Sequence, residues 1–145
     1  MFSAMVVFMA ASPGAGGIQV PPACDLTLGM ECVDKSVPGV SIWRMSAHER
    51  FANPAGVMQG GFVAAFMDSA MGAATVTFSS AKVFSSNVDL SISFLRPALI
   101  GSSLTCTAKV ISGGERVLFV EADVTDDQGR HVARAHSTYL LRPRG

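Results

Sequence analysis

The sequence predicts an α+β fold in which one long central helix is wrapped by an antiparallel sheet. The stretch from Gln59 to about Thr75 carries apolar residues at the 3.6-residue spacing of a helix. Several other stretches show the two-residue alternation of strands. Turn-forming pairs such as Pro38-Gly39 and Gly113-Gly114 separate these stretches, which is typical of antiparallel neighbours.

Two strands are expected before the helix. The first covers Met30–Lys35 and follows a short helical turn or an extended segment. The second covers residues 39–47, after the Pro38-Gly39 turn. Its two faces hold Val40, Ile42 and Arg44 on one side and Ser41, Trp43 and Met45 on the other. Asn53-Pro54 then breaks the pattern, so Phe51–Gly56 is expected to be a loop.

The predicted helix is small or apolar on every face. Its helical spacing is carried by Phe62, Val63, Phe66, Met67, Ala70, Met71 and Ala74. The remaining positions hold mostly Ala and Gly, so we expect the helix to be buried on nearly every side.

Four strand-like runs follow the helix and form an antiparallel meander. They cover Val83–Leu95, Ser103–Ile111, Arg116–Val124 and His131–Leu141. Turns are expected at Gly113-Gly114 and at Asp126–Gly129. The edge strands of such a sheet need covering, which favours a dimer with a continuous sheet.

The composition also indicates an oligomer. Apolar residues make up 49% of the 145 residues and charged residues only 15%, against about 25% in typical soluble domains. A chain this poor in charge is expected to bury apolar surface between subunits, as a homodimer or homotetramer. Its net charge is zero and it has no basic run, so a nucleic-acid partner is not expected.

Residues 1–22 are interpreted as a flexible leader before a single domain over residues 23–145. The leader begins with an apolar run, so a signal peptide remains an alternative, although the basic residues of one are missing. The run is too short to cross a bilayer, and no membrane association is expected.

The cysteines and histidines indicate no metal site and favour a cytoplasmic location. The three cysteines, Cys24, Cys32 and Cys106, are odd in number and scattered, which suits free thiols in a reducing compartment. Together with the three histidines they show no paired metal-ligand spacing.

Asp68 is the one acid within the apolar stretch from Asn53 to Ala74. A carboxylate in such surroundings loses several kcal/mol of hydration unless a partner compensates for it. The structural interpretation is that Ser69, Thr75 or backbone amides satisfy it. The functional interpretation is that it acts on a substrate.

Gly60-Gly61 at the start of the helix supports the functional interpretation. The first amides of a helix have no intrahelical partner and lie at the positive end of its dipole. Glycine there lets a carbonyl or oxyanion approach the backbone closely. Ordinary capping or tight helix packing is the alternative explanation of this pair.

Gly60 and Asp68 lie too far apart on one helix to act on the same carbonyl. Eight residues correspond to roughly 12 Å of helical rise. Two antiparallel helices side by side bring Gly60 of one chain near Asp68 of the other. This arrangement predicts two equivalent composite sites in a dimer.

The motif residues resemble those of the hotdog-fold acyl-CoA thioesterases, closest to the phenylacetyl-CoA-thioesterase-like subgroup. The resemblance rests on Asn53-Pro54-x-Gly56-x-x-Gln59-Gly60-Gly61 followed by Asp68, and on the segment VDLSISFLRPA at residues 88–98. It covers about Leu28 to Leu141. It implies a dimer of hotdogs that takes acyl-CoA as its substrate and needs no cofactor.

The resemblance also implies roles for individual residues. Asp68 matches the catalytic acid, which acts as general base or as nucleophile. Gly60 matches the glycine whose amide binds the thioester oxygen, with Gly61 beside it. Asn53 matches a loop asparagine that helps to place the water or the carboxylate. Gln59 stands where many members carry histidine, and it donates a hydrogen bond but takes up no proton.

Two further substrate-binding positions follow from the same resemblance. Either Ser86 or Asn87 stands where members carry a hydroxyl residue that orients water. Arg96 is the first choice for a coenzyme A phosphate, ahead of Arg116 and Arg142. The many apolar side chains favour an apolar acyl group.

Two other functions remain open from the sequence. One is a hotdog enoyl-CoA hydratase or dehydratase, which would need an acid and a histidine near the helix. The other is a non-catalytic module that binds acyl-CoA and has lost turnover through Gln59.

Overall fold

The computed structural model describes residues 20–144. The predicted leader therefore lies outside the described residues, apart from residues 20–22. The elements in chain order are α1 (Ala23–Leu28), β1 (Glu31–Asp34), β2 (Val40–Ser46), the 3-10 helix η1 (Glu49–Phe51), α2 (Gly60–Phe78), β3 (Val83–Asn87), β4 (Ser91–Phe94), β5 (Ser103–Gly113), β6 (Val117–Thr125) and β7 (His131–Pro143).

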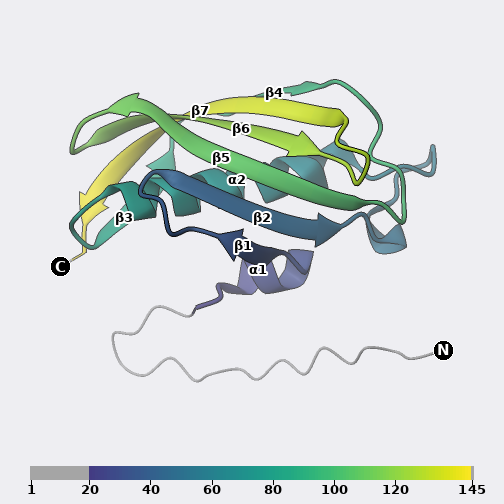
Figure 1. Ribbon diagram of the computed structural model, residues 1–145, viewed down its shortest axis with the longest axis horizontal. Helices are drawn as coiled ribbons and strands as arrows, with labels where there is room; N and C mark the ends of the chain where they lie inside the picture. The colour runs from purple at the N-terminus through teal and green to yellow at the C-terminus, as the bar shows by residue number, and fades with distance from the viewer. Residues whose placement is uncertain (1–19, 145) are drawn as a thin grey trace.

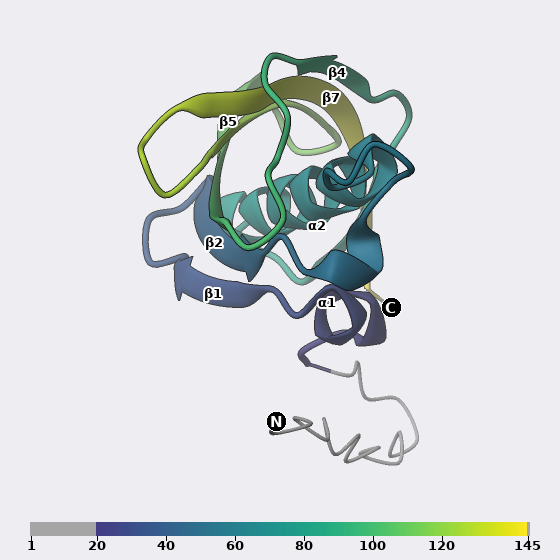
Figure 2. The same ribbon diagram turned by 90° about the vertical axis from the view of Figure 1, so that its right-hand side faces the viewer.

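The strands form one seven-stranded sheet that curls around α2 (Figures 1 and 2). Its order is β1-β2-β5-β6-β7-β3, and β4 also pairs with β7. Every pairing is antiparallel. The predicted α+β fold, one long helix wrapped by an antiparallel sheet, is confirmed.

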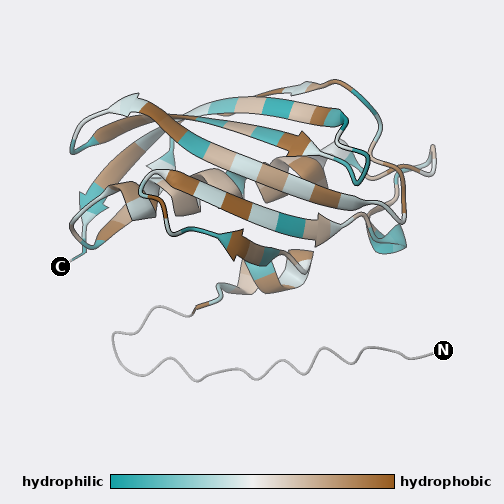
Figure 3. Cartoon of the chain, in the orientation of Figure 1, coloured by the Kyte–Doolittle hydropathy of each residue, from teal (hydrophilic) through white to brown (hydrophobic). Residues whose placement is uncertain are grey.

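The strands alternate because one face of the sheet packs on α2. Bands of opposite hydropathy follow one another along β2 and β5 (Figure 3). In β2, Ser41, Trp43 and Met45 are buried, as the sequence alternation predicts. Trp43 therefore belongs to the core, although its indole nitrogen has no hydrogen-bond partner among the described residues.

A row of small side chains lets α2 lie close to the middle of the sheet. Ser41 pairs with Ala108, Ala108 with Ala122, and Ala122 with Ala135 across four neighbouring strands. All four residues are buried. The Ser41 hydroxyl donates a 2.6 Å hydrogen bond to the backbone carbonyl of Ala70 in α2. This bond fixes the helix over the row.

The prediction of one continuous strand over Val83–Leu95 is wrong. The run divides into β3 and β4, both paired with β7. Asn87 pairs with Tyr139 and Ser91 pairs with His136. The run therefore advances four residues while β7 advances three, and the extra residue forms a β-bulge. Asp89 stabilises the bulge, because its carboxylate accepts a 2.6 Å hydrogen bond from the Thr138 amide.

The prediction that the helix is buried on nearly every side is also wrong within the single chain. The sheet covers one side of the helix, and the side chains buried there are Val63, Phe66, Met67, Ala70, Met71, Ala74 and Thr75. The uncovered side carries small residues such as Gly61, which is exposed and where a Cβ atom would meet nothing within 4 Å. By length and composition α2 is long and apolar enough to cross a bilayer. Here its apolar side packs on the sheet.

Candidate active site

The start of α2 presents unpaired amides. Gln59 is the N-cap residue, and its side chain makes no capping hydrogen bond. The Gln59 amide donates to the Phe51 carbonyl at 2.8 Å, which fixes the chain just before the helix. Among residues 20–144, no acceptor is bonded to the amides of Gly60 and Gly61. Both amides therefore remain available to an incoming oxygen atom.

The two glycines differ in their surroundings. A Cβ atom at Gly60 would lie 3.0 Å from the Phe94 ring, closer than most such contacts, whereas a Cβ at Gly61 would meet nothing within 4 Å. Gly60 therefore allows Phe94 of β4 to lie directly against the helix start. Gly61 faces open space.

A cavity of about 330 Å³ lies beside the helix start. It contains two of the predicted site residues, Gly60 and Arg96. The remaining lining residues are all apolar: Val57, Met58, Val63, Phe94, Leu95, Pro97, Ala98 and Val132. The Arg96 amide donates to the Val132 carbonyl at 3.2 Å, and this bond holds the Arg96 backbone next to β7.

Asp68 lies farther along α2 and is half-buried. The Tyr139 hydroxyl of β7 donates a 2.9 Å hydrogen bond to Asp68 Oδ1 and lies 3.1 Å from the Asp68 backbone carbonyl oxygen. The structural alternative drawn from the sequence named Ser69, Thr75 or backbone amides as partners of Asp68. Those partners are wrong, and Thr75 donates to the Gly72 carbonyl at 2.6 Å.

Tyr139 is the functional candidate that the sequence reasoning missed. A signal was present, because Tyr139 stands at an inward position of an alternating strand and buried tyrosines usually find a hydrogen-bond partner. Burial raises the pKa of the Tyr139 hydroxyl well above its ordinary value, and the neighbouring Asp68 carboxylate raises it further. Tyr139 is therefore neutral, and its hydroxyl keeps its proton while it donates a hydrogen bond to Asp68.

Asn53 holds the loop that precedes the helix. Its side-chain oxygen accepts hydrogen bonds from the Ala55 amide at 2.9 Å and the Val57 amide at 3.3 Å. Its backbone amide donates to the Val57 carbonyl at 2.8 Å. The side-chain oxygen is thus engaged within the loop, and the side-chain nitrogen is the end available to a substrate or water.

The orientation of β3 shows which of Ser86 and Asn87 faces the helix α2. Val83 is buried in the core, and the Ser85 hydroxyl lies 3.9 Å from the Cβ position of Gly72 in α2. Because strand side chains alternate, Asn87 shares this helix-facing side and Ser86 points the other way. Asn87 is also the residue paired with Tyr139.

The predicted residues form two groups within one chain. The first group is Gly60 and Gly61 at the start of α2, with Arg96 in the cavity beside them. The second group is Asp68 farther along α2, with Tyr139 of β7 and Asn87 of β3 beside it. Asp68 is not among the residues that line the cavity beside Gly60. Arg116 and Arg142 line a different hollow, of about 810 Å³, next to Phe78 at the far end of the helix.

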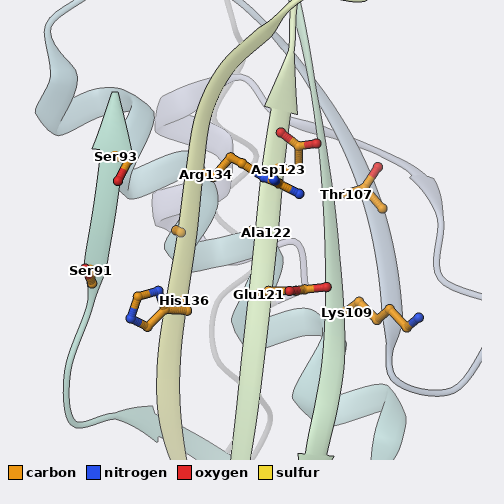
Figure 4. A pocket seen from close by; sticks show the side chains of 10 residues that line it. Ser91, Ser93, Thr107, Lys109, Glu121, Ala122, Asp123, Arg134 and His136 are labelled. Carbon is orange, nitrogen blue, oxygen red and sulfur yellow. The ribbon is translucent and has the colours of Figure 1, made fainter. Parts of the chain in front are cut away.

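The outer face of the sheet carries another hollow, of about 580 Å³. Charged side chains of β5, β6 and β7 meet there, among them Lys109, Glu121 and Arg134 (Figure 4). It contains none of the predicted site residues. Residues 20–144 hold no group of three or more His, Cys, Asp or Glu side chains that could bind a metal ion.

A single helix inside a curled antiparallel sheet, with free amides at the helix start, defines a hotdog-fold protein. Residues 55–133 match the thioesterase superfamily, and the chain belongs to that family. It is thus a thioesterase, and the resemblance found in its motifs is confirmed.

Relatives and solved structures agree with this assignment. Human acyl-coenzyme A thioesterase 13 is 29% identical over 111 residues, which are 72% of this chain and 79% of the relative. A phenylacetic acid degradation-related protein from Ralstonia eutropha is 30% identical, with a TM-score of 0.77 over 87% of this chain and 94% of that one. The PaaI protein of Escherichia coli, at 22% identity, shares the fold with a TM-score of 0.78 over 83% and 84% of the two chains.

Proposed function

We propose that this protein hydrolyses acyl-CoA thioesters to a free acid and coenzyme A. The observation that carries the proposal is the position of Asp68. It is the only charged side chain of α2 and lies half-buried at the border of the side that the sheet leaves uncovered. The name of the human relative and the family membership support the same substrate class.

The chemistry follows from the two groups of residues. A thioester carbonyl oxygen bound at the Gly60 amide would be polarised by the helix N-terminus, with Gly61 beside it. Asp68 then removes a proton from a water molecule that adds to the carbonyl carbon, or it attacks that carbon itself. The carbon–sulfur bond breaks, the thiolate takes up a proton, and water supplies the acid's new oxygen.

The remaining site residues have supporting roles in this proposal. Gln59 donates a hydrogen bond at the helix start, while the Asn53 amide group and Asn87 orient the attacking water. Arg96 binds a phosphate of coenzyme A at the cavity rim. Because the rest of that cavity is apolar, an apolar acyl group is favoured.

The site is composite, with Gly60 from one chain and Asp68 from the other. Within one helix, these residues are separated by roughly 12 Å. Gly61, Ala65, Asp68 and Gly72 recur at spacings of four, three and four residues, so they lie along one face of the helix. The edge of this face meets β3 and β7 at Gly72 and Asp68. The small residues on this face let a second, antiparallel helix approach closely. Free Cys24 and Cys32 on the surface support a reducing, cytoplasmic setting.

The direct test is thiol release from short, medium, long and aryl acyl-CoAs by the wild type and by Asp68→Asn. We expect Asp68→Asn to lose at least about 100-fold in kcat, because an amide can neither accept the proton nor attack. Circular dichroism serves as the control for folding. If Asp68→Asn is as active as the wild type, the assignment of Asp68 as the catalytic acid is wrong. Tight binding of acyl-CoA without any thiol release would indicate the non-catalytic module.

Co-expression tests the composite site. Asp68→Asn removes the acid of the composite site, and Gly60→Pro removes its oxyanion donor. A dimer with one chain of each variant therefore has one site in which Gly60 and Asp68 are both native and one site in which both are replaced. Random pairing then restores about one quarter of the wild-type rate. If Gly60 and Asp68 of the same chain worked together, the mixture would stay inactive.

A further inference from the structure

The contact between Tyr139 and Asp68 joins two elements that are far apart in sequence. The residues are 71 positions apart, and the hydroxyl–carboxylate distance is 2.9 Å. Tyr139 is only 2% exposed. It lies on the inner face of β7, next to Gly72, where a Cβ atom would be 4.0 Å from the tyrosine ring. The ring is thus held in place by packing.

This hydrogen bond distinguishes the two oxygens of the carboxylate. Oδ1 accepts the tyrosine hydroxyl, while Oδ2 has no hydrogen-bond partner among residues 20–144. A free carboxylate can rotate about its terminal bond and exchange its oxygens. Donation from a packed, neutral phenol restricts that rotation and leaves Oδ2 as the oxygen available for chemistry.

We propose that Tyr139 is a positioning residue that holds Asp68 Oδ1 and so directs Oδ2 toward the water or thioester. This inference rests on the proposed function, because it assigns a role to the residue that aligns Asp68. Burial and the neighbouring carboxylate both raise the pKa of Tyr139, so the hydroxyl keeps its proton over the working pH range. Tyr139 itself does not touch the reacting atoms.

A purely structural role is the competing explanation, since the same hydroxyl ties β7 to α2. Ser41 provides a matched control. Its hydroxyl is fully buried and donates to the carbonyl of Ala70, two residues beyond Asp68 on the same helix. Ser41→Ala therefore removes a comparable anchor without touching the carboxylate.

The test compares Tyr139→Phe with Ser41→Ala. Tyr139→Phe keeps the ring, and we expect kcat to fall about tenfold or more with KM unchanged, because misalignment of a reacting group acts on the chemical step. Ser41→Ala should lower Tm by a few degrees but leave kcat within twofold. Equal kcat values for Tyr139→Phe and the wild type would overturn the inference.

The double variant separates this inference from the proposed function. If Tyr139 acts through Asp68, then Asp68→Asn combined with Tyr139→Phe is no slower than Asp68→Asn alone. A further loss in the double variant would contradict the inference while leaving thioester hydrolysis intact. A wild type that releases no thiol from any acyl-CoA would overturn both.

A spectroscopic readout does not depend on a stable Tyr139→Phe protein. Tyr139 is the only tyrosine of the chain, so biosynthetic 3-fluorotyrosine places a single fluorine atom on the ring of Tyr139, next to its hydroxyl group. The fluorine resonance is expected to shift in Asp68→Asn and to stay in place in Ser41→Ala. An unchanged resonance in Asp68→Asn would show that the contact is not formed in solution.

Discussion

At the residue scale, Gly60 combines two properties that substitution can separate: a free amide and the absence of a side chain. Proline is accepted at the first position of a helix, and Gln59, with φ −59° and ψ 132°, already has the backbone conformation that precedes proline. Gly60→Pro therefore removes the amide proton without breaking the helix. Gly60→Ala keeps that proton and adds the same Cβ atom against Phe94.

We expect Gly60→Pro to lower kcat by roughly 10²–10³, the usual effect of losing one oxyanion donor. Gly60→Ala should cost far less, since alanine keeps the amide proton that would bind the oxyanion. Thiol-release kinetics on both variants check this prediction, with circular dichroism to confirm folding. Similar losses in the two variants would mean that the side-chain contact, not the amide, matters at this position.

At the element scale, the position of α2 depends on the row of small side chains beneath it. Ala122 is the centre of that row, paired with Ala108 on one side and Ala135 on the other. A larger side chain there would push the helix away from the sheet. It would thereby disturb the Tyr139–Asp68 contact as well as the core.

Ala122→Leu is expected to lower the free energy of unfolding by about 1–3 kcal/mol, as overpacking of a core does. Urea denaturation measures the change. Thr107→Leu is the control, because Thr107 precedes Ala108 but faces the outer side of the sheet. That variant should stay within about 0.5 kcal/mol of the wild type. Equal effects would show that the row does not limit the helix position.

At the scale of the whole molecule, apolar side chains concentrate along the edge formed by β3 and β4. Exposed residues on this edge are Phe84, Val88, Leu90, Phe94 and Leu95. A sheet edge with this much apolar surface is what a second subunit would cover. The edge adjoins both the Phe94–Gly60 contact and the strand that carries Asn87, so covering it would complete the site.

We expect Val88→Lys, at a residue 59% exposed, to convert the proposed dimer to monomers and abolish activity while the circular dichroism spectrum is unchanged. A charge placed in an apolar interface loses its hydration without gaining a partner. Analytical ultracentrifugation measures the assembly. Val37→Lys is the control, since Val37 is 54% exposed but lies in the turn between β1 and β2. Active monomers of Val88→Lys would contradict the composite site.

Most of the secondary-structure elements, and the residues proposed for the site, could be predicted from local sequence patterns. The helix period, the strand alternation and the Gly and Pro turns are local properties, and they predicted α2, β2 and the three strands β5, β6 and β7 to within a few residues. The first strand of the predicted four-stranded meander is wrong, because residues 83–94 pair with β7 and β5 pairs with β2 instead. The motif around Gly60 and Asp68 is local too, because both residues lie on one helix. For the same reason, the roughly 12 Å between them could be derived without coordinates.

The contacts between residues far apart in the sequence depend on the folded arrangement of the strands. The bulge at Asp89, the choice of Asn87 over Ser86 and the contact of Tyr139 with Asp68 all depend on the register of β3 and β7 beneath the helix. Register is set by the combined packing of several strands on α2, and a one-residue shift moves every side chain to the opposite face. A local pattern does not contain that information, so the partner of Asp68 became visible only in the folded chain.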